Sequence, residues 1–369
     1  MLTASTENRF VTGSVPVVMK AAVYSGRRTV NVEEIQTPKL GPGEALIRVE
    51  SCGICHTDLK KIEYDLLTPP RVYGHETAGV IAEVGAGVKD YAPGDRVVVF
   101  HHIPCMECFY CLHKLYAQCP IYKRVGVTAG FEPAGGGFSQ YVRAMDWIVR
   151  RGMEKIPDGV PFERASFVEP VNTCLKGFLM LDAKPGDVLV VLGQGPIGLI
   201  FTALARRSGA TIITTDTMPF RREMSVRCGA LASYDPKQDK AREHILELTS
   251  GRGADAIIVA ASAPGIAGQA VRLSRPGSRI LLFAQTSHQE RIELSGADIC
   301  VGERTLLGSY SASVDLQAES ARMVFEGDLP VEDLISDRVA LNEIRTGIDL
   351  ALHPGERSLK IMVQPQRWT

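Results

Sequence analysis

A short apolar segment, a glycine-rich turn and a long apolar segment, together spanning residues 187–210, constrain the fold of this chain most. Residues 187–193, DVLVVLG, have the composition of a buried strand, and residues 196–210 have the pattern of a helix with proline in its first turn. Further strand-like and helix-like segments alternate at 211–216, 221–230, 239–250, 254–261, 265–275 and 278–285. This alternation predicts βαβ units and a parallel sheet.

The first 165 residues have a different pattern. Short apolar runs at 20–24, 44–50, 78–84 and 95–100 are separated by turn signals such as GPGE and APGD, which predicts a mainly β domain. After about residue 307 the alternation weakens, and the chain ends in a strand-like segment at 359–365. We therefore expect the last 60 or so residues to rejoin the first domain.

The composition is that of a globular protein with room for two domains. The chain has 369 residues, of which 45% are hydrophobic and 22% charged, and a net charge of −1. This charge gives no electrostatic reason to expect a nucleic-acid or membrane partner, and no apolar run approaches the roughly 20 residues of a membrane span. The first residues lack the basic segment and apolar core of a signal peptide. We expect a cytoplasmic protein whose cysteines stay reduced.

The glycine-rich turn has the context of a dinucleotide site. It follows a predicted strand and opens a predicted helix, and its residues are Gly193, Gln194, Gly195, Pro196, Ile197 and Gly198. In a G-x-G-x-x-G turn the glycines allow a tight turn, close approach of a pyrophosphate and close packing of helix on strand. The alternative is a glycine-rich turn that binds no nucleotide.

An acidic residue, Asp216, ends the next predicted strand. A carboxylate there accepts hydrogen bonds from the ribose hydroxyls of NAD and repels the 2′-phosphate of NADP, so NAD is favoured. Arg221 and Arg222 follow closely, and their positive charge would weaken that preference.

Four cysteines occur within fifteen residues. Nine cysteines is an odd number, and a reducing compartment disfavours disulfides. Four thiolates complete a tetrahedral zinc shell, which predicts a structural site. An iron–sulfur cluster is the alternative, but seven residues rather than three precede the last cysteine. The spacing is C-x2-C-x2-C-x7-C, over Cys105, Cys108, Cys111 and Cys119.

Candidate ligands for a second, open metal site are scattered along the chain. A thiolate, an imidazole and a carboxylate would form a three-ligand shell with a vacant fourth position. Each residue taken singly also has an ordinary structural explanation, and spacing alone does not join them. The candidates are Cys55, His75, Glu76 and Glu169.

Several motifs in this one chain together resemble the zinc-dependent medium-chain alcohol dehydrogenases, in particular the polyol, sorbitol and threonine dehydrogenase branch. They are C-G-I-C-x-T-D, G-H-E, the four-cysteine segment, P-G-D-R-V and the glycine turn, and the resemblance begins near Lys20. It implies an α/β protein in which a GroES-like β catalytic domain, residues 18–170 and 308–369, surrounds a Rossmann domain, residues 171–307. Residues 1–17 would be an N-terminal extension.

The resemblance also implies roles for individual residues. Cys55, His75 and Glu169 resemble the catalytic zinc ligands, and Glu76 an alternating or outer carboxylate. Asp58 matches the residue that hydrogen-bonds the ligand histidine.

Three further positions are interpreted in the same way. Thr57 matches the hydroxyl that relays the proton of the substrate. Lys60 departs from the family, which has a histidine there, and this puts the outer relay in doubt. Cys52 and Cys174 are rival thiols, which we exclude because Glu169 takes the place of the family's second cysteine.

An open zinc and NAD predict hydride transfer between a secondary alcohol and its ketone, in enzyme class EC 1.1.1, with about two zinc ions per chain. With a glutamate in the ligand set, the site resembles those of family members that act on polyols, sugar derivatives or amino-hydroxy compounds. His101 and His102 fall where the family's substrate pocket begins; the alternative is that they face solvent. Relatives of this kind form dimers or tetramers.

Three alternative functions remain open at this point. They are a simple-alcohol dehydrogenase of the same family, a metal-free quinone reductase and a non-catalytic nucleotide-binding protein.

Overall fold

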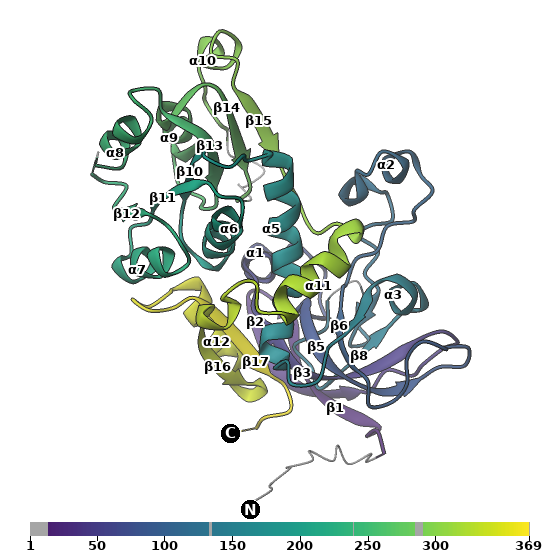
Figure 1. The fold of residues 1–369 in the computed structure, drawn as a ribbon. Helices are drawn as coiled ribbons and strands as arrows, with labels where there is room; N and C mark the ends of the chain where they lie inside the picture. Colours follow the sequence, from purple (N-terminus) through teal and green to yellow (C-terminus); the bar gives the residue numbers. More distant parts are fainter. Residues whose placement is uncertain (1–13, 133–134, 239, 285–290, 369) are drawn as a thin grey trace, which may run out of the picture.

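The computed structural model describes residues 14–132, 135–238, 240–284 and 291–368 (Figure 1). The extension predicted over residues 1–17 lies mostly outside them, and residues 14–17 have no helix or strand. Within the described chain, no helix combines the length and the apolar composition that crossing a bilayer requires.

A six-stranded sheet forms the nucleotide-binding half, and every pairing in it is parallel. The strands, in spatial order, are β12 (Ala232–Tyr234), β11 (Thr211–Thr215), β10 (Val188–Leu192), β13 (Ala254–Val259), β14 (Ser274–Leu282) and β15 (Thr305–Gly308). The predicted parallel sheet is therefore confirmed. One boundary differs, because β14 begins at Ser274, where we predicted the preceding helix to continue to residue 275.

Helices cover both faces of this sheet because alternate residues of a strand point to opposite faces. In β10, Leu189 and Val191 belong to the hydrophobic cluster shared with α5 (Val168–Leu181) and α6 (Pro196–Arg207). Val190 and Leu192 belong to the cluster on the other face, with α8 (Lys240–Leu248) and α9 (Ile266–Leu273). The remaining helices of this half are α7 (Pro219–Arg227) and α10 (Gly296–Cys300).

The other half of the molecule is built from two mainly antiparallel sheets, in which the pairing of β16 with β17 is parallel. One has the order β2-β1-β4, and the other β16-β17-β3-β5-β6-β9, with β7 and β8 at its side. The strands are β1 (Val18–Gly26), β2 (Thr29–Gln36), β3 (Ala45–Gly53), β4 (Arg71–Val72), β5 (Glu76–Val84), β6 (Arg96–Val99), β7 (Val127–Thr128), β8 (Tyr141–Ala144), β9 (Met153–Lys155), β16 (Ile335–Ala340) and β17 (Lys360–Gln364).

Short helices connect these strands. They are α1 (His56–Glu63), α2 (Phe109–Leu112), α3 (Asp146–Arg151), α4 (Phe162–Ala165), α11 (Gln317–Phe325) and α12 (Ile344–Leu352), with 3-10 turns η1 (Tyr116–Gln118), η2 (Val314–Leu316), η3 (Val331–Leu334) and η4 (Leu341–Glu343).

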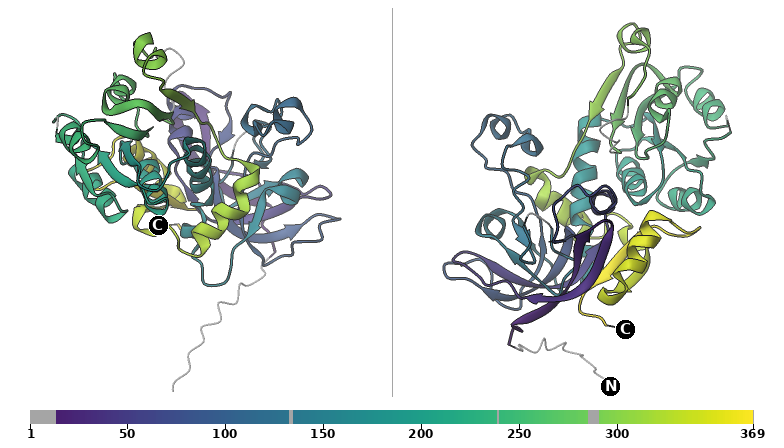
Figure 2. Two further views of the ribbon diagram at one scale, coloured as in Figure 1. Left: turned by 45° about the horizontal axis from the view of Figure 1, so that its top comes forward. Right: turned by 180° about the vertical axis from the view of Figure 1, so that it is seen from behind.

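The end of the chain lies beside its first third. β17 pairs with β3, with Met362 opposite Gly53 and Val363 opposite Cys52. Figure 2 shows the C-terminal elements, in yellow, against the N-terminal strands, in purple. The predicted fold class is confirmed, whereas the domain limits at 170/171 and 307/308 stay a prediction, because α5 continues across the first of them.

Candidate metal and cofactor sites

The four cysteines of the predicted structural zinc site converge in a loop, residues 105–119, that projects from the mainly antiparallel sheets near α2 (Figure 1). We call this loop the lobe. The sulfur of Cys111 lies 3.8 Å from that of Cys105 and 3.6 Å from that of Cys108, and the sulfurs of Cys105 and Cys119 are 3.6 Å apart. Sulfurs at the corners of a tetrahedron about 2.3 Å from zinc are roughly 3.8 Å from each other. All four are free thiols, so the donor set and its size fit a closed zinc site.

The lobe is tied to the segment that follows β15. The Tyr116 hydroxyl donates to the Asp315 carboxylate at 2.9 and 2.8 Å. The Tyr122 hydroxyl lies 2.9 Å from Ser311 Oγ and donates to the Ala312 carbonyl at 3.1 Å. Order in the lobe is thereby coupled to the chain that leaves the parallel sheet.

A second group of candidate ligands lies between α1 and β5. One ligand atom each from Cys55, His75 and Glu76 lie within 4.8 Å of one another. Cys55 is the N-cap of α1, and Glu76 begins β5, so a helix end and a strand end bring them together. His75 and Glu76 are buried, whereas Cys55 is half-buried. Thiolate, imidazole and carboxylate fit zinc, and three ligands leave a position for substrate.

Asp58 contacts the histidine of this group, and the resemblance implies that it orients this ring. Its Oδ1 lies 3.1 Å from His75 Nδ1, and the side chain is 1% exposed. Burial by itself raises the pKa of Asp58, but the charge of His75 and their hydrogen bond outweigh burial and lower it. For His75, burial lowers the pKa, and the charges of Asp58 and Cys55 outweigh it and raise the pKa well above its usual range.

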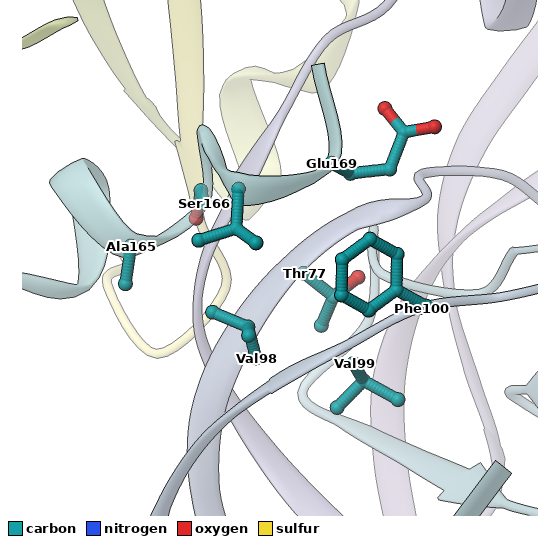
Figure 3. Close-up of a pocket in the computed structure, with 8 residues that line it drawn as sticks. Thr77, Val98, Val99, Phe100, Ala165, Ser166 and Glu169 are labelled. Atoms are coloured by element: carbon teal, nitrogen blue, oxygen red, sulfur yellow. The ribbon is translucent and has the colours of Figure 1, made fainter. Parts of the chain in front are cut away.

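Glu169 lies at the start of α5, near this group but outside it. The charges of the same residues act on its carboxylate. Burial raises the pKa of Glu169 to about 7, the charge of His75 opposes this rise, and the charge of Glu76 adds to it. Figure 3 shows Glu169 at the edge of a small cavity between α4, α5 and β6, with its carboxylate turned away from Val98 and Ala165. The cavity volume of about 10 Å³ is room for about one water molecule.

Sequence reasoning missed one charged residue of the site, Lys360. It lies on β17 and is 6% exposed. Its Nζ donates to Glu76 Oε1 at 2.5 Å and to the Ile54 carbonyl at 3.1 Å. Gly53 leaves room for the pair, because a Cβ there would meet Glu76 Oε2 at 1.9 Å. The available signal was a lysine inside the apolar segment LKIMVQP.

The other predicted residues take up the following places. Thr57 and Lys60 are both half-buried on α1. The Cys52 thiol is fully buried beside Thr77, at 3.7 Å, and the Cys174 thiol beside the Ile197 carbonyl, at 4.0 Å. Among the described residues, neither thiol belongs to a metal-ligand group.

His101 and His102 extend a row of rings away from the metal ligands. The ring centres of His75 and His101 are 4.7 Å apart, and those of His101 and His102 are 3.9 Å apart. Tyr122 continues the row at 5.0 Å from His102. His101 is buried and His102 half-buried, so the alternative of two histidines facing solvent is disfavoured.

The glycine turn has the geometry that a bound pyrophosphate requires. Gly193 has φ of 92°, and a Cβ there would meet that of Ala261 at 2.5 Å. A Cβ on Gly198 would meet the Gly193 carbonyl oxygen at 1.9 Å, so helix and strand pack closely. Among the described residues other than its two chain neighbours, the only atom that a Cβ on Gly195 would meet within 4 Å is Nη1 of Arg221, at 3.9 Å, which leaves open space at the start of α6.

Asp216 lies beside this turn. Its two carboxylate oxygens accept backbone N–H groups of Gln194, at 2.7 Å, and of Met218, at 2.8 Å, and each oxygen retains a lone pair for a ligand. Arg222 donates to the carbonyls of Asp216 and Thr217. Arg221 donates through Nη2 to the Ser358 carbonyl at 3.2 Å, and its buried Nε has no hydrogen-bond partner among the described residues.

Comparison with known families and proteins agrees with this geometry. The family described as the alcohol dehydrogenase GroES-like domain matches residues 41–157, and the zinc-binding dehydrogenase family matches residues 196–326. Sorbitol dehydrogenase of Bacillus subtilis (strain 168) is 30% identical over 97% of this chain and 100% of its own. L-Threonine 3-dehydrogenase of Thermococcus kodakarensis is 32% identical over 75% of this chain and 77% of its own.

Two solved structures show the same fold. A zinc-binding dehydrogenase from Sinorhizobium meliloti 1021, bound to NADP, is 29% identical, with a TM-score of 0.85, over 94% of this chain and 99% of that one. A dehydrogenase from Escherichia coli CFT073 in complex with NADH is 26% identical, with a TM-score of 0.84, over 95% of this chain and 100% of that one.

Proposed function

Because the chain belongs to the zinc-containing medium-chain alcohol dehydrogenase family, we propose that it interconverts a secondary alcohol and its ketone by hydride transfer with NAD. The family makes it a zinc-dependent dehydrogenase of the branch that includes the sorbitol, butanediol and threonine enzymes. The observation that carries the proposal is the convergence of Cys55, His75 and Glu76 in an open, partly buried group.

A zinc ion held there supplies Lewis acidity that lowers the pKa of a substrate hydroxyl, and NAD at the glycine turn supplies the hydride acceptor. Asp58 accepts the Nδ1–H of His75, which leaves Nε2 free to bind metal. Thr57 is the group that we propose takes the hydroxyl proton. The ammonium group of a protonated Lys60 has no lone pair with which to accept a proton. The proton therefore passes from Thr57 to solvent.

We assign Glu169 as the third ligand and Glu76 as the carboxylate that exchanges with it. Lys360 supports this assignment, because its ion pair with Glu76 competes with a metal for that carboxylate, whereas Glu169 has no such cation at hydrogen-bonding distance among the described residues.

The proposed substrate is a polyol, a sugar derivative or an amino-hydroxy compound. The support is the glutamate in the ligand set and the two imidazoles of His101 and His102, which present hydrogen-bonding groups where a simple-alcohol enzyme needs an apolar wall. Sorbitol and threonine dehydrogenases are among the relatives. We also propose a homodimer or homotetramer, which light scattering would test.

The preference for NAD is proposed from Asp216 and has its own test. Asp216→Ala should weaken NAD binding and favour NADP relative to wild type, with Arg221 meeting the added phosphate. Arg222 is less suited, because its guanidinium group already donates to two carbonyls. Wild-type protein that already prefers NADP would refute this assignment.

The test of the whole proposal is a panel of secondary alcohols, offered with NAD and with NADP to protein of measured zinc content. We expect about two zinc ions per chain and NADH formation. Folded protein without zinc would favour a quinone reductase, and zinc-loaded protein that oxidises no alcohol would favour a non-catalytic role. A preference for primary alcohols over polyols would favour the alternative that the protein is a simple-alcohol dehydrogenase of the same family.

A further inference from the structure

Two lysines flank the outer end of the row of rings formed by His75, His101, His102 and Tyr122. Lys61 is half-buried on α1, and its Nζ lies 5.9 Å from the centre of the Tyr73 ring. Lys123 directly follows Tyr122, and its Nζ lies 5.5 Å from the centre of the Tyr310 ring. Both lysines act electrostatically on His102. They approach it from two different segments of the chain.

No carboxylate neutralises these two cations. Within the described chain, neither Lys61 nor Lys123 has an ion-pair partner within 4.0 Å. The acids nearby have other roles: Asp58 is bonded to His75, Glu76 is paired with Lys360, and Glu169, whose charge acts on Tyr122, is the carboxylate that we assign to the metal.

The acid that the lobe contacts is also occupied. Asp315 accepts from Tyr116 and lies 3.9 Å from Lys114. Among the described residues, no ion pair therefore balances the positive charge of Lys61 and Lys123.

His102 itself has an unused hydrogen-bonding atom. Its Nδ1 is buried and has no hydrogen-bond partner within the part of the chain that the structure describes. Burial, and then the charge of Lys61, lower the pKa of His102 to about 3, so the ring is neutral near pH 7. A neutral imidazole can donate or accept, and a buried polar atom without a partner costs free energy unless water or a ligand meets it. The charges of Lys61 and Lys123 act on this same ring.

We propose that the alcohol oxidised by this protein carries an anionic group, a carboxylate or a phosphate ester, which Lys61 and Lys123 bind while the hydroxyl reacts at the metal. The inference rests on the proposed function and narrows its substrate class. A neutral polyol makes hydrogen bonds but leaves both cations unpaired, whereas an anion forms charge-assisted bonds with them. Two cations at the outer end of the row of rings would also attract an anionic substrate at long range.

Matched pairs of substrates test this inference. The first pair is 3-hydroxybutyrate and its neutral methyl ester, and the second is sorbitol 6-phosphate and sorbitol. With zinc-loaded protein and NAD, we expect kcat/KM to be about 10-fold or more higher for the anion in at least one pair, the gain expected of a charge-assisted bond. The pair that responds distinguishes a carboxylate from a phosphate.

Variants connect the preference to the two lysines. Lys61→Gln and Lys123→Gln should each narrow the ratio between anionic and neutral substrates about 10-fold, and added salt should narrow it for wild type. Lys89→Gln is the matched control, because Lys89 is exposed in the turn between β5 and β6. Equal kcat/KM values within both pairs, or ratios that neither variant changes, would overturn the inference.

A binding measurement separates this inference from the proposed function. Calorimetry on zinc- and NADH-loaded protein would follow the binding of 3-hydroxybutyrate and of sorbitol 6-phosphate without turnover. If no alcohol is oxidised, the proposed function fails; saturable binding of either anion that Lys61→Gln weakens would still support an anion site. Absence of binding by both anions would overturn the inference even if neutral polyols are oxidised.

Discussion

The two candidate metal sites are assembled in opposite ways. The lobe takes four identical ligands from residues 105–119, and their sulfurs are already spaced as a tetrahedral zinc requires. The open site takes a thiolate and an imidazole from residues 55 and 75, and has two glutamates and a lysine from as far away as residue 360. A metal with four protein ligands has no position for substrate, so the lobe site can only stabilise the fold. The open site, built from distant segments, keeps a coordination position free for substrate and contains charges that compete for the ligands.

The charges show the same contrast. In the lobe, backbone N–H groups of Glu107 and Cys108 lower the pKa of Cys105 to about 6, so the chain prepares a thiolate locally. In the open site, Glu76 needs the charge of Lys360, from the last ten residues, as a partner. Changing one residue in each site should therefore have separable consequences.

The largest effect is expected in the lobe. Cys108→Ser removes one of four thiolates, and structural zinc binding contributes on the order of 10 kcal/mol to the folding of small zinc domains. We expect the lobe zinc to be lost and the melting temperature to fall, while any folded protein keeps the other zinc. Metal analysis and calorimetry measure this, with Cys300→Ser, an exposed cysteine, as control. A folded variant that retains both metals would contradict the four-cysteine assignment.

The next effect is on turnover. Glu169→Ala should lower kcat roughly 1000-fold, about 4 kcal/mol, because it removes a ligand of the Lewis acid. Zinc should fall from about two per chain towards one, with the lobe intact and NADH binding retained, since the glycine turn is separate.

Cys174→Ser is the matched control for this prediction, and Glu76→Gln decides which glutamate binds at rest. If Cys174→Ser loses zinc and Glu169→Ala keeps it, the site has two thiolates. The proposed polyol substrate would then lose its main support.

A smaller effect is expected from the buried ion pair. Lys360→Met leaves Glu76 as a buried, unpaired charge, which should cost about 3 kcal/mol of unfolding free energy in zinc-free protein. Denaturant unfolding measures it. Adding Glu76→Gln should recover most of the loss; equal stability of the single variant and wild type would show that the pair contributes nothing.

The smallest effect sharpens the contrast between the sites. Asp58→Asn keeps the size of the side chain but weakens the hydrogen bond that orients His75, and should lower zinc affinity at the open site about 10- to 100-fold. Chelator competition resolves the two zinc ions. Equal weakening of both sites would indicate general unfolding rather than a positioning role.

Features whose parts lie close together along the chain could be predicted before the fold was known. The spacing of Cys105, Cys108, Cys111 and Cys119 predicted a lobe that the structure assembles, because a loop of fifteen residues brings its own ends together. The strand, glycine turn and helix at 188–207 were predictable for the same reason, since periodicity and turn geometry are local. The family resemblance joined into one ligand set the candidate residues that spacing could not join.

Only the tertiary structure decided which distant groups share one site. It places Lys360 against Glu76, 284 positions away, and leaves Glu169 outside the tight group that Cys55, His75 and Glu76 form. It also brings Lys61 and Lys123 close enough to act electrostatically on His102. No local pattern encodes such contacts, because they arise from the pairing of β17 with β3 and from the packing of α5 against β5.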